Sequence, residues 1–294
     1  MYHLARTAQD THSMNITFSL FPKFYREYSP QQLAELVRHT GLDTVNLVVR
    51  DGYWCEPATV ARNAPRFVAA MREYGIQVHF ATTDLHAADI MRQPEILAAF
   101  AECGIRNFRL NHFHAGERDI KSALREVRRQ LETLAPWCQK FGVRAVNQLH
   151  HHTLVSSPSA AFALVDGLPP EAISVELDAG NQAFEGFEDW KRSVELLGPY
   201  LSAVGVKDTA LVRDMSHASD DDKGWRRNWA PLGEGVTNWK TLLRALHTNN
   251  FSGTLVFMAF YHDTEEAART RVLGEEVAYL RRIIAAVESE GAKT

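Results

Sequence analysis

In residues 41–49, GLDTVNLVV, a glycine is followed at once by a short run of mostly apolar residues. The same pattern recurs in GIQVHFATT (75–83), GIRNFRLNH (104–112) and GVRAVNQLH (142–150). Glycine readily adopts the left-handed conformation that is found just after a helix. A run that is apolar at most positions is typical of a parallel strand buried on both faces. Each stretch therefore predicts the end of one helix and the strand that follows it.

The rest of the chain continues this alternation. Further strands are expected at residues 15–20, 172–178, 201–207 and 254–260. Amphipathic helices are expected at residues 30–40, 57–74, 119–140, 190–197, 238–246 and 264–290. Strict alternation of eight strands with eight helices predicts parallel strands joined by right-handed crossovers. Eight such units in 294 residues fit one (β/α)8 barrel.

We therefore expect an α/β protein with a single (β/α)8 TIM barrel over residues 14–294 and an N-terminal extension over residues 1–13. No GxGxxG motif follows the first strand, which argues against a dinucleotide-binding fold. The polar segment 214–228 is expected to be a loop after the seventh strand. It is long enough to act as a lid or as a contact between the subunits of a homodimer.

The composition excludes several classes of protein. The chain is 45% hydrophobic and 23% charged, with a formal net charge of −4, which argues against binding to nucleic acid or to anionic membranes. No apolar run approaches the roughly 20 residues of a membrane helix, and the N-terminus lacks the apolar core of a signal peptide. Three widely spaced cysteines do not suggest a disulfide framework. We expect a cytoplasmic protein that binds neither nucleic acid nor membranes.

Polar residues gather where the predicted strands end, which is where barrels of this kind carry their active sites. Such residues are costly to bury unless they pair or bind a ligand. Arg50 and Arg109 are candidate anion holders, because a guanidinium is a planar bidentate donor. For Arg50 a structural ion pair is an equally good interpretation. The other candidates at the strand ends are His112, Gln148, His150, Glu176, Asp178, Asn181, Lys207 and Asp208.

Lys207 is the strongest single candidate, because a lysine at the end of a buried strand is costly unless it is paired. It could polarise a carbonyl or bind an anion, or form a Schiff base if burial lowered its pKa. An ion pair with Asp178 or Glu176 across the barrel mouth is the structural alternative. The two interpretations are compatible, because such a pair can be part of a site.

The sequence resembles the xylose isomerase-like TIM barrel family of sugar phosphate isomerases and epimerases from about Asn15 to Ala285. The motifs that carry the resemblance are GLDTVNLVVRDGYWCEP, FATTDL, GIRNFRL, NQLHHH, ELDAGN, GVKD and WAPLGEGVTNW, of which the last two are the most specific. In the family, the turn within WAPLGEGVTNW closes the site. The resemblance therefore implies that Trp229 stacks on a sugar face and that Glu234 contacts the substrate.

Metal-dependent relatives hold one divalent cation with Glu, Asp, His and Glu from strands five to eight. The resemblance places these positions on Gln148, Asp178, Gly205 and Met258, so only Asp178 remains a good ligand. We therefore expect a divergent member without a metal or other cofactor. The alternative is Mn, Mg or Zn bound by Asp178 with His150 and His152, which alternate along a strand. We favour instead a His150 that hydrogen-bonds substrate while its neighbours lie in the loop.

These residues suggest an isomerase-like or lyase-like enzyme acting on a carbohydrate or polyol derivative. His150 or Asp178 would remove a proton next to a carbonyl, and Lys207 with Arg109 would stabilise the resulting enediolate. Gln148, Asn181 and Glu234 would orient hydroxyl groups, while Arg50, His112, Asp208 and Trp229 would also contact the substrate.

Other functions remain open at this point. A lyase or dehydratase acting on a keto-sugar would use the same chemistry. A non-catalytic carbohydrate-binding protein on the same scaffold is suggested by the loss of three metal ligands. A metal-dependent DNA repair nuclease is much less consistent, because it needs several zinc ligands and a basic DNA-binding face.

Overall fold

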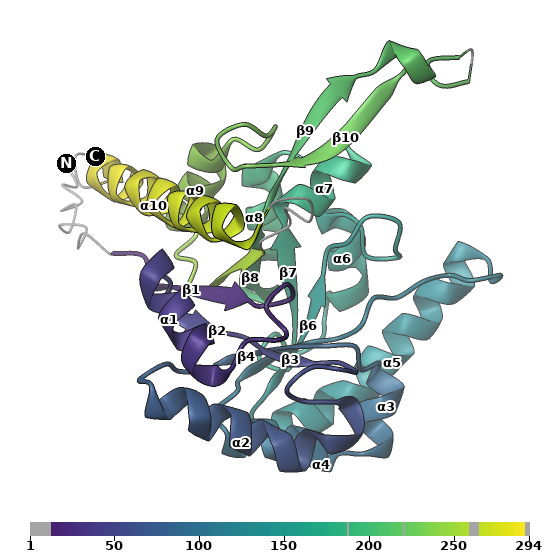
Figure 1. The fold of residues 1–294 in the computed structure, drawn as a ribbon. Helices are drawn as coiled ribbons and strands as arrows, with labels where there is room; N and C mark the ends of the chain where they lie inside the picture. The colour runs from purple at the N-terminus through teal and green to yellow at the C-terminus, as the bar shows by residue number, and fades with distance from the viewer. Residues whose placement is uncertain (1–12, 187, 220, 259–264, 292–294) are drawn as a thin grey trace, which may run out of the picture.

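A ring of parallel strands forms the centre of the molecule (Figure 1). The computed structural model describes residues 13–186, 188–219, 221–258 and 265–291. The strands of the ring are β1 (Ile16–Phe21), β2 (Thr44–Val45), β3 (Leu47–Val49), β4 (Phe80–Thr83), β5 (Asn107–Arg109), β6 (Arg144–Gln148), β7 (Ile173–Asp178), β8 (Leu201–Val206) and β11 (Gly253–Met258). Their order is β2-β1-β11-β8-β7-β6-β5-β4-β3, and every neighbouring pair is parallel.

The two ends of this order, β2 and β3, are consecutive pieces of one strand position. They are separated only by Asn46, whose backbone N donates to Leu20 O of β1 at 2.8 Å. Because β2 pairs with β1 and β3 pairs with β4, this position closes the ring. The molecule is therefore a (β/α)8 TIM barrel, as the sequence predicts.

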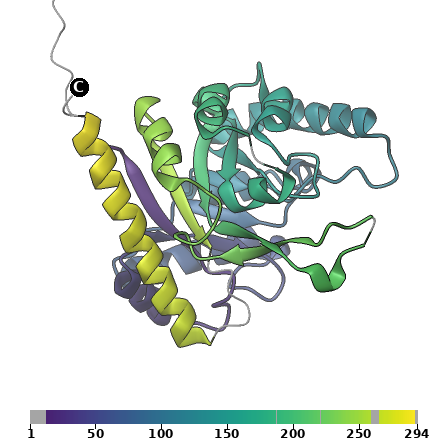
Figure 2. The ribbon, with the colours of Figure 1, turned by 90° about the horizontal axis from the view of Figure 1, so that it is seen from above.

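Helices surround the ring (Figures 1 and 2). They are α1 (Pro30–Thr40), α2 (Val60–Glu73), α3 (Ala87–Arg92), α4 (Glu95–Glu102), α5 (Ile120–Phe141), α6 (Pro158–Val165), α7 (Ala179–Glu185), α8 (Trp190–Leu197), α9 (Trp239–Thr248) and α10 (Glu266–Gly291), with short 3-10 turns at Pro57–Thr59, Gly198–Tyr200 and Met215–His217. The expectation of eight helices is too low, because β4 and β7 are each followed by two. The alternation of strand and helical segment itself holds.

The predicted helix ends are confirmed. Ser29 accepts a hydrogen bond from Gln32 N at the start of α1, where Pro30 takes the first helical position. Gly41 ends α1 with φ 74°, and Gly142 ends α5 with φ 63°. Gly75 and Gly104 also have positive φ. All four glycines that open the quoted stretches thus adopt the conformation predicted for them.

The segment 214–228 is only partly the loop that its polarity predicts. Strand β10 (Trp225–Ala230) pairs antiparallel with β9 (Asp208–Arg213), and the two form a hairpin that stands out from the barrel (Figures 1 and 2). The prediction fails because most of the hairpin side chains are exposed, so its sequence lacks the apolar pattern of a buried strand. Four of the large apolar side chains that are exposed in the described residues lie here, namely Leu211, Val212, Met215 and Trp225.

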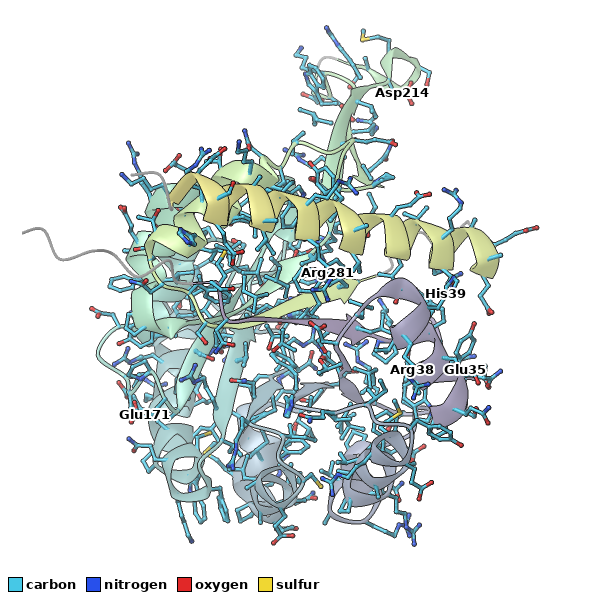
Figure 3. All side chains as sticks on the ribbon, turned by 90° about the vertical axis from the view of Figure 1, so that its left-hand side faces the viewer. Glu35, Arg38, His39, Glu171, Asp214 and Arg281 are labelled. Carbon is cyan, nitrogen blue, oxygen red and sulfur yellow. The ribbon has the colours of Figure 1, made fainter. Side chains whose placement is uncertain are left out.

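The long helix α10, near the C-terminal end of the described residues, packs against α1 and bonds to the segment that follows it. Arg281 donates to Gly41 O at 2.8 Å and to Asp43 Oδ1 at 2.9 Å, and its guanidinium lies 4.3 Å from the centre of the Phe18 ring. Figure 3 shows Arg281 facing the side of α1 that carries Arg38 and His39. This contact covers the outer side of β1.

The ends of several elements differ from those expected, and some expected segments fall on residues that the structure does not describe. The strand expected at residues 254–260 is described only to Met258, and residues 259–264 lie outside the described residues. The same holds for residues 1–12 of the expected N-terminal extension. No described helix is long and apolar enough to cross a membrane.

An apolar cluster fills the inside of the barrel and supports the site above it. It consists of Phe21, Val48, Phe80, Val146, Ala203, Val256 and Met258. Each of these residues alternates along its strand with residues that pack against the surrounding helices. This cluster therefore packs beneath the polar side chains that point inward at the C-terminal ends of the strands.

Candidate active site

Side chains from successive strand ends form a continuous chain of polar contacts across the barrel mouth. Parallel strands bring these ends to the same rim. The contacts are Arg50 Nε to Asp84 Oδ1 (2.9 Å), Arg109 Nη2 to Asp84 Oδ1 (3.7 Å), Arg109 Nη1 to Gln148 Oε1 (2.7 Å), Gln148 Nε2 to Asp178 Oδ2 (2.7 Å) and Lys207 Nζ to Asp178 Oδ2 (3.2 Å). Residues predicted from separate strands therefore form one connected network.

Asp178 and Lys207 form the buried ion pair of this network. Asp178 is fully buried at the end of β7 and also accepts a hydrogen bond from Asn181 N at 2.8 Å, which caps α7. Lys207 Nζ donates to Asn181 Oδ1 at 2.9 Å and lies 4.6 Å from the centre of the Trp229 ring. Burial raises the pKa of Asp178 and lowers that of Lys207, while the charge of each partner opposes these shifts. The ion pair suggested for Lys207 is confirmed.

Glu176, a strand-end candidate for which the sequence suggested only an ion pair with Lys207, belongs to the network through Gln148. It lies two residues before Asp178 on the same face of β7, is 1% exposed, and accepts a hydrogen bond from Gln148 Nε2 at 3.1 Å. Burial, together with the negative charge of Asp178, raises its pKa to about 8. Glu176 therefore favours its protonated form at neutral pH, while Lys207 pairs with Asp178. The alternation Glu-Leu-Asp along a strand was the available signal.

The rings of His112, His150 and His151 pack in a row beside the network. The ring centres of His112 and His150 lie 4.1 Å apart, and those of His150 and His151 lie 4.5 Å apart. His150 Nδ1 lies 2.9 Å from His151 O. Because a carbonyl only accepts, Nδ1 carries the hydrogen and Nε2 keeps its lone pair. Burial lowers the pKa of His150 to about 3 and also lowers that of His112, so both rings are neutral at physiological pH.

His152 does not join His150 and Asp178. It has φ 59°, its side chain is 79% exposed, and its backbone N donates to Glu185. Within the described residues no three His, Cys, Asp or Glu side chains are grouped as metal ligands. The alternative metal site at Asp178 with the two histidines is therefore not assembled.

Asp208 lies next to Lys207 but faces away from the network. Its carboxylate accepts hydrogen bonds from Thr209 N (2.8 Å), Thr237 N (3.2 Å) and Trp239 Nε1 (2.9 Å). These contacts hold the segment that leads into α9. Consecutive residues of an extended chain point in opposite directions, so only one of the two could face the mouth. We therefore assign Asp208 an anchoring role instead of substrate binding.

The remaining predicted residues lie at the edge. Trp229 is half-buried on β10, with its ring centre 4.8 Å from that of Phe184, and together they cover Lys207. Glu234 is exposed on the turn that its backbone N closes on Pro231 O at 2.9 Å. The structure thus brings Trp229 to the network and leaves Glu234 on the surface.

A model of the xylose isomerase-like TIM barrel family matches residues 34–283. The chain belongs to this family. No curated protein matches the sequence. Among solved structures, a xylose isomerase domain protein from Alicyclobacillus acidocaldarius is 16% identical, with a TM-score of 0.70, and the match covers 92% of this chain and 99% of that chain.

Two further structures of the family are similarly related. D-psicose 3-epimerase from Clostridium cellulolyticum H10 is 12% identical, with a TM-score of 0.69 and coverage of 91% of this chain and 99% of that chain. A family protein from Mycobacterium smegmatis, solved in complex with magnesium, is 14% identical, with a TM-score of 0.66 and coverage of 94% and 98%. At these identities the likeness establishes the fold.

The four positions at which the family resemblance places metal ligands do lie together. Gln148 Nε2 is 2.7 Å from Asp178 Oδ2 and 4.0 Å from Met258 Sδ, and a Cβ added to Gly205 would lie 2.7 Å from Asp178 Oδ2. The residues do not fit a divalent cation, however. An amide NH2 and the Lys207 ammonium already point at the one carboxylate, while glycine offers no side-chain ligand and a thioether is a poor one.

Lys23 is a residue near the mouth that the sequence did not point to. It follows β1 and is half-buried, and Tyr53 Oη donates to its carbonyl oxygen at 2.8 Å. Burial lowers the pKa of Lys23, and the positive charges of Arg50, Lys207 and Arg109 lower it further. Its ammonium lies 5.4 Å from the centre of the Phe24 ring, on the segment that follows β1. The sequence gives no strand-end signal at Lys23, because Phe21 and Pro22 separate it from the strand expected to end at Leu20.

Proposed function

We propose that this chain is a sugar isomerase- or epimerase-like enzyme that removes a proton next to a carbonyl group of a carbohydrate or polyol derivative. The proposal rests on one observation at the strand ends. Buried Lys207 pairs with Asp178, and Gln148 bonds to both Asp178 and Arg109. Relatives of the same fold include enzymes named D-psicose 3-epimerase and L-ribulose 3-epimerase, which supports this class of reaction.

In the proposed step, Asp178 accepts the proton and the bonding electrons move onto the carbonyl oxygen, giving an enediolate. Burial raises the pKa of Asp178 but lowers that of His150 to about 3, so Asp178 is the stronger base and His150 the alternative. Lys207 and Arg109 stabilise the oxyanion, because preorganised cations in a water-poor site act on charge as it develops. Protonation of the opposite face of the same carbon completes an epimerisation, and protonation of the neighbouring carbon completes an isomerisation.

The same arrangement supports a reaction without the bridging metal of the family. Lys207 supplies a positive charge beside Asp178, and the donor set around it does not suit a divalent cation. Asn181 is fixed by Lys207 at 2.9 Å and by His151 Nδ1 at 2.8 Å. In the proposal Gln148, Asn181 and His112 orient hydroxyl groups, and Trp229 packs against the sugar.

The test is exchange of the substrate proton with solvent. The full-length protein is incubated in D2O with a panel of ketoses, keto-sugars and sugar phosphates, and deuterium incorporation next to the carbonyl is followed by NMR. We expect exchange that falls by a factor of about 100 or more in Lys207→Met with Asp178→Asn, since removal of one oxyanion donor alone costs about that much. Full turnover by this double variant would refute the assignment.

A matched control removes an ion pair outside the site. Lys191 Nζ lies 3.7 Å from Glu195 Oε1 on the exposed surface of α8. The variant Lys191→Met with Glu195→Gln is therefore expected to exchange at the wild-type rate. Metal analysis of protein purified without chelators tests the metal-free part, and a stoichiometric bound metal would contradict it.

A non-catalytic carbohydrate-binding protein is the second candidate. It is favoured by Gly205 and Met258, which replace two of the family's metal ligands, and by the closed hydrogen bonding of Asp178. Saturable binding of a sugar without deuterium exchange in any member of the panel would support it over the enzyme. A dehydrated keto-sugar among the products would instead identify a lyase.

A further inference from the structure

Two guanidinium groups share one carboxylate at the side of the mouth formed by β3, β4 and β5. Asp84 Oδ1 lies 2.9 Å from Arg50 Nε and 3.7 Å from Arg109 Nη2. Arg109 is 4% exposed, and its Nε has no hydrogen-bond partner in the described part of the chain. One negative charge thus faces two positive ones, and a buried donor is left unsatisfied, which costs free energy in the absence of a ligand.

Arg50 is placed to accept such a ligand. Its guanidinium lies over the Phe21 ring, 5.4 Å from the ring centre, and its contact with Asp84 uses Nε. In the described residues Nε makes no hydrogen bond despite its closeness to Asp84, so Nε and the terminal nitrogens can donate to a ligand. The side chain is 17% exposed, so it reaches solvent at the mouth. A guanidinium held flat in this way is suited to bidentate binding of a carboxylate or phosphate.

The neighbouring acids do not cancel this positive charge. The negative charge of Asp178 is paired with Lys207, and Gln148 lies between this pair and Arg109. Glu176 is 1% exposed and lies on the Asp178 side of the network, where it accepts a hydrogen bond from Gln148 Nε2 at 3.1 Å. Lys23 lies close to Arg50 in the fold, because the Arg50 guanidinium packs over Phe21, two residues before Lys23. Tyr53 also bonds to the carbonyl oxygens of both Arg50 and Lys23. The described mouth is thus locally positive in a chain whose formal net charge is −4.

We propose that Arg50 and Lys23 bind an anionic group of the substrate, a carboxylate or a phosphate, with Arg109 beneath it. The substrate is then a sugar acid or a phosphorylated sugar. Its anionic end lies on the β1–β3 side and its reacting carbon lies toward Asp178 and Lys207. This inference rests on the proposed function for the position of the reacting carbon, but binding of the anionic group is measurable without turnover.

The test is calorimetric titration of the full-length protein with D-glucuronate, D-glucose 6-phosphate, inorganic phosphate and the neutral sugar D-glucose. We expect at least one anionic sugar to bind about tenfold or more tightly than D-glucose, as one charge-assisted hydrogen bond allows. Arg50→Met and Lys23→Met should each weaken that binding about tenfold and leave D-glucose binding unchanged. Lys191→Met, which removes an exposed lysine far along the chain on α8, should change neither.

Each outcome decides something. Preference for D-glucuronate identifies a carboxylate, and preference for D-glucose 6-phosphate identifies a phosphate. Equal binding of charged and neutral sugars, binding of inorganic phosphate alone, or unchanged affinity in a folded Arg50→Met protein would overturn the proposal. Lys23→Met gives the same test if Arg50→Met does not fold, because Lys23 is only half-buried. Failure of proton exchange with Arg50-dependent binding intact would count against the proposed function and not against this subsite.

Discussion

From β5 to β8 the barrel mouth is lined by Arg109, Gln148, Asp178 and Lys207, whereas β1 and β11 end at Phe21 and Met258. On the first side the groups are buried and bonded to one another. On the second side the two ends belong to the apolar cluster inside the barrel. We call these two sets of described strand ends the polar half and the apolar half of the rim.

This division separates two tasks. The polar half holds every buried group of the network that could move a proton or stabilise an oxyanion. The apolar half supplies shape, and its cations come from residues beyond the strands, Lys23 after β1 and Arg50 after β3. The proton transfer is thus expected in the polar half and the anchoring of the substrate at Arg50 and Lys23, with Arg109 between the two.

The largest expected effect on the free energy of unfolding comes from replacing one charged side chain of the polar half with an apolar one. Lys207→Met leaves the fully buried Asp178 carboxylate without its cation. We expect a loss of about 3–5 kcal/mol in the free energy of unfolding, measured by urea unfolding at pH 8. The loss should shrink as the pH falls, because burial raises the pKa of Asp178 and a protonated carboxyl needs no cation. Adding Asp178→Asn should restore part of the stability.

The matched control lies in the apolar half. Met258→Leu conserves volume and removes no charge, so it should cost less than about 1.5 kcal/mol. If Lys207→Met and Met258→Leu proved equally costly at pH 8, the two halves would not differ energetically and the comparison would fail.

A second prediction concerns the proton on Glu176. The folded protein binds this proton up to about pH 8, whereas the unfolded chain releases it near the ordinary value of 4.5. Between these values the folded state holds more protons, so stability falls as the pH rises. We expect wild type to lose on the order of 3 kcal/mol across this window, and Glu176→Gln to lose markedly less. Urea unfolding between pH 5 and 8.5 measures both slopes.

An exposed carboxyl serves as the control for that experiment. Glu195 has a side chain that is 47% exposed on α8, so Glu195→Gln should keep the wild-type slope. A Glu176→Gln protein with that same slope would show that Glu176 is ionised at neutral pH. The network would then carry more negative charge than Lys207 balances.

How far the sequence predicts this molecule depends on what each residue is bonded to. The glycine-led strands were predictable, because burial on both faces leaves an apolar run and a helix end needs the positive φ seen at Gly41 and Gly142. The β9–β10 hairpin was not, since its exposed side chains leave no such pattern. Local signals therefore predict the buried scaffold better than the elements that project from it.

The candidate site was predictable as a set of strand ends but not in the roles of its members. Lys207 and Asp208 are adjacent polar residues, yet one faces Asp178 and the other binds Trp239. Glu176 gives no hint in the sequence that it keeps its proton, because this depends on burial and on the charge of Asp178. Such properties arise only from contacts between strands.

The smallest expected effect probes the space at the centre of the polar half. A Cβ added at Gly205 would lie 2.7 Å from Asp178 Oδ2 and 3.0 Å from Glu176 Oε1. Alanine normally favours a strand over glycine by roughly 0.5–1 kcal/mol, but here it must displace two buried carboxyl groups. We therefore expect Gly205→Ala to cost about 1–3 kcal/mol, as overpacked cores do. The displacement should also slow proton exchange.

Gly233 is the matched control, because it is exposed and a Cβ added there meets nothing within 4 Å. Gly233→Ala should be close to neutral in the same urea unfolding experiment. A neutral Gly205→Ala would mean that the carboxyl groups leave room between β7 and β8. In that case position 205, where the family has its histidine ligand, would have space for a ligand. The proposal of a reaction without the metal would then lose its structural basis.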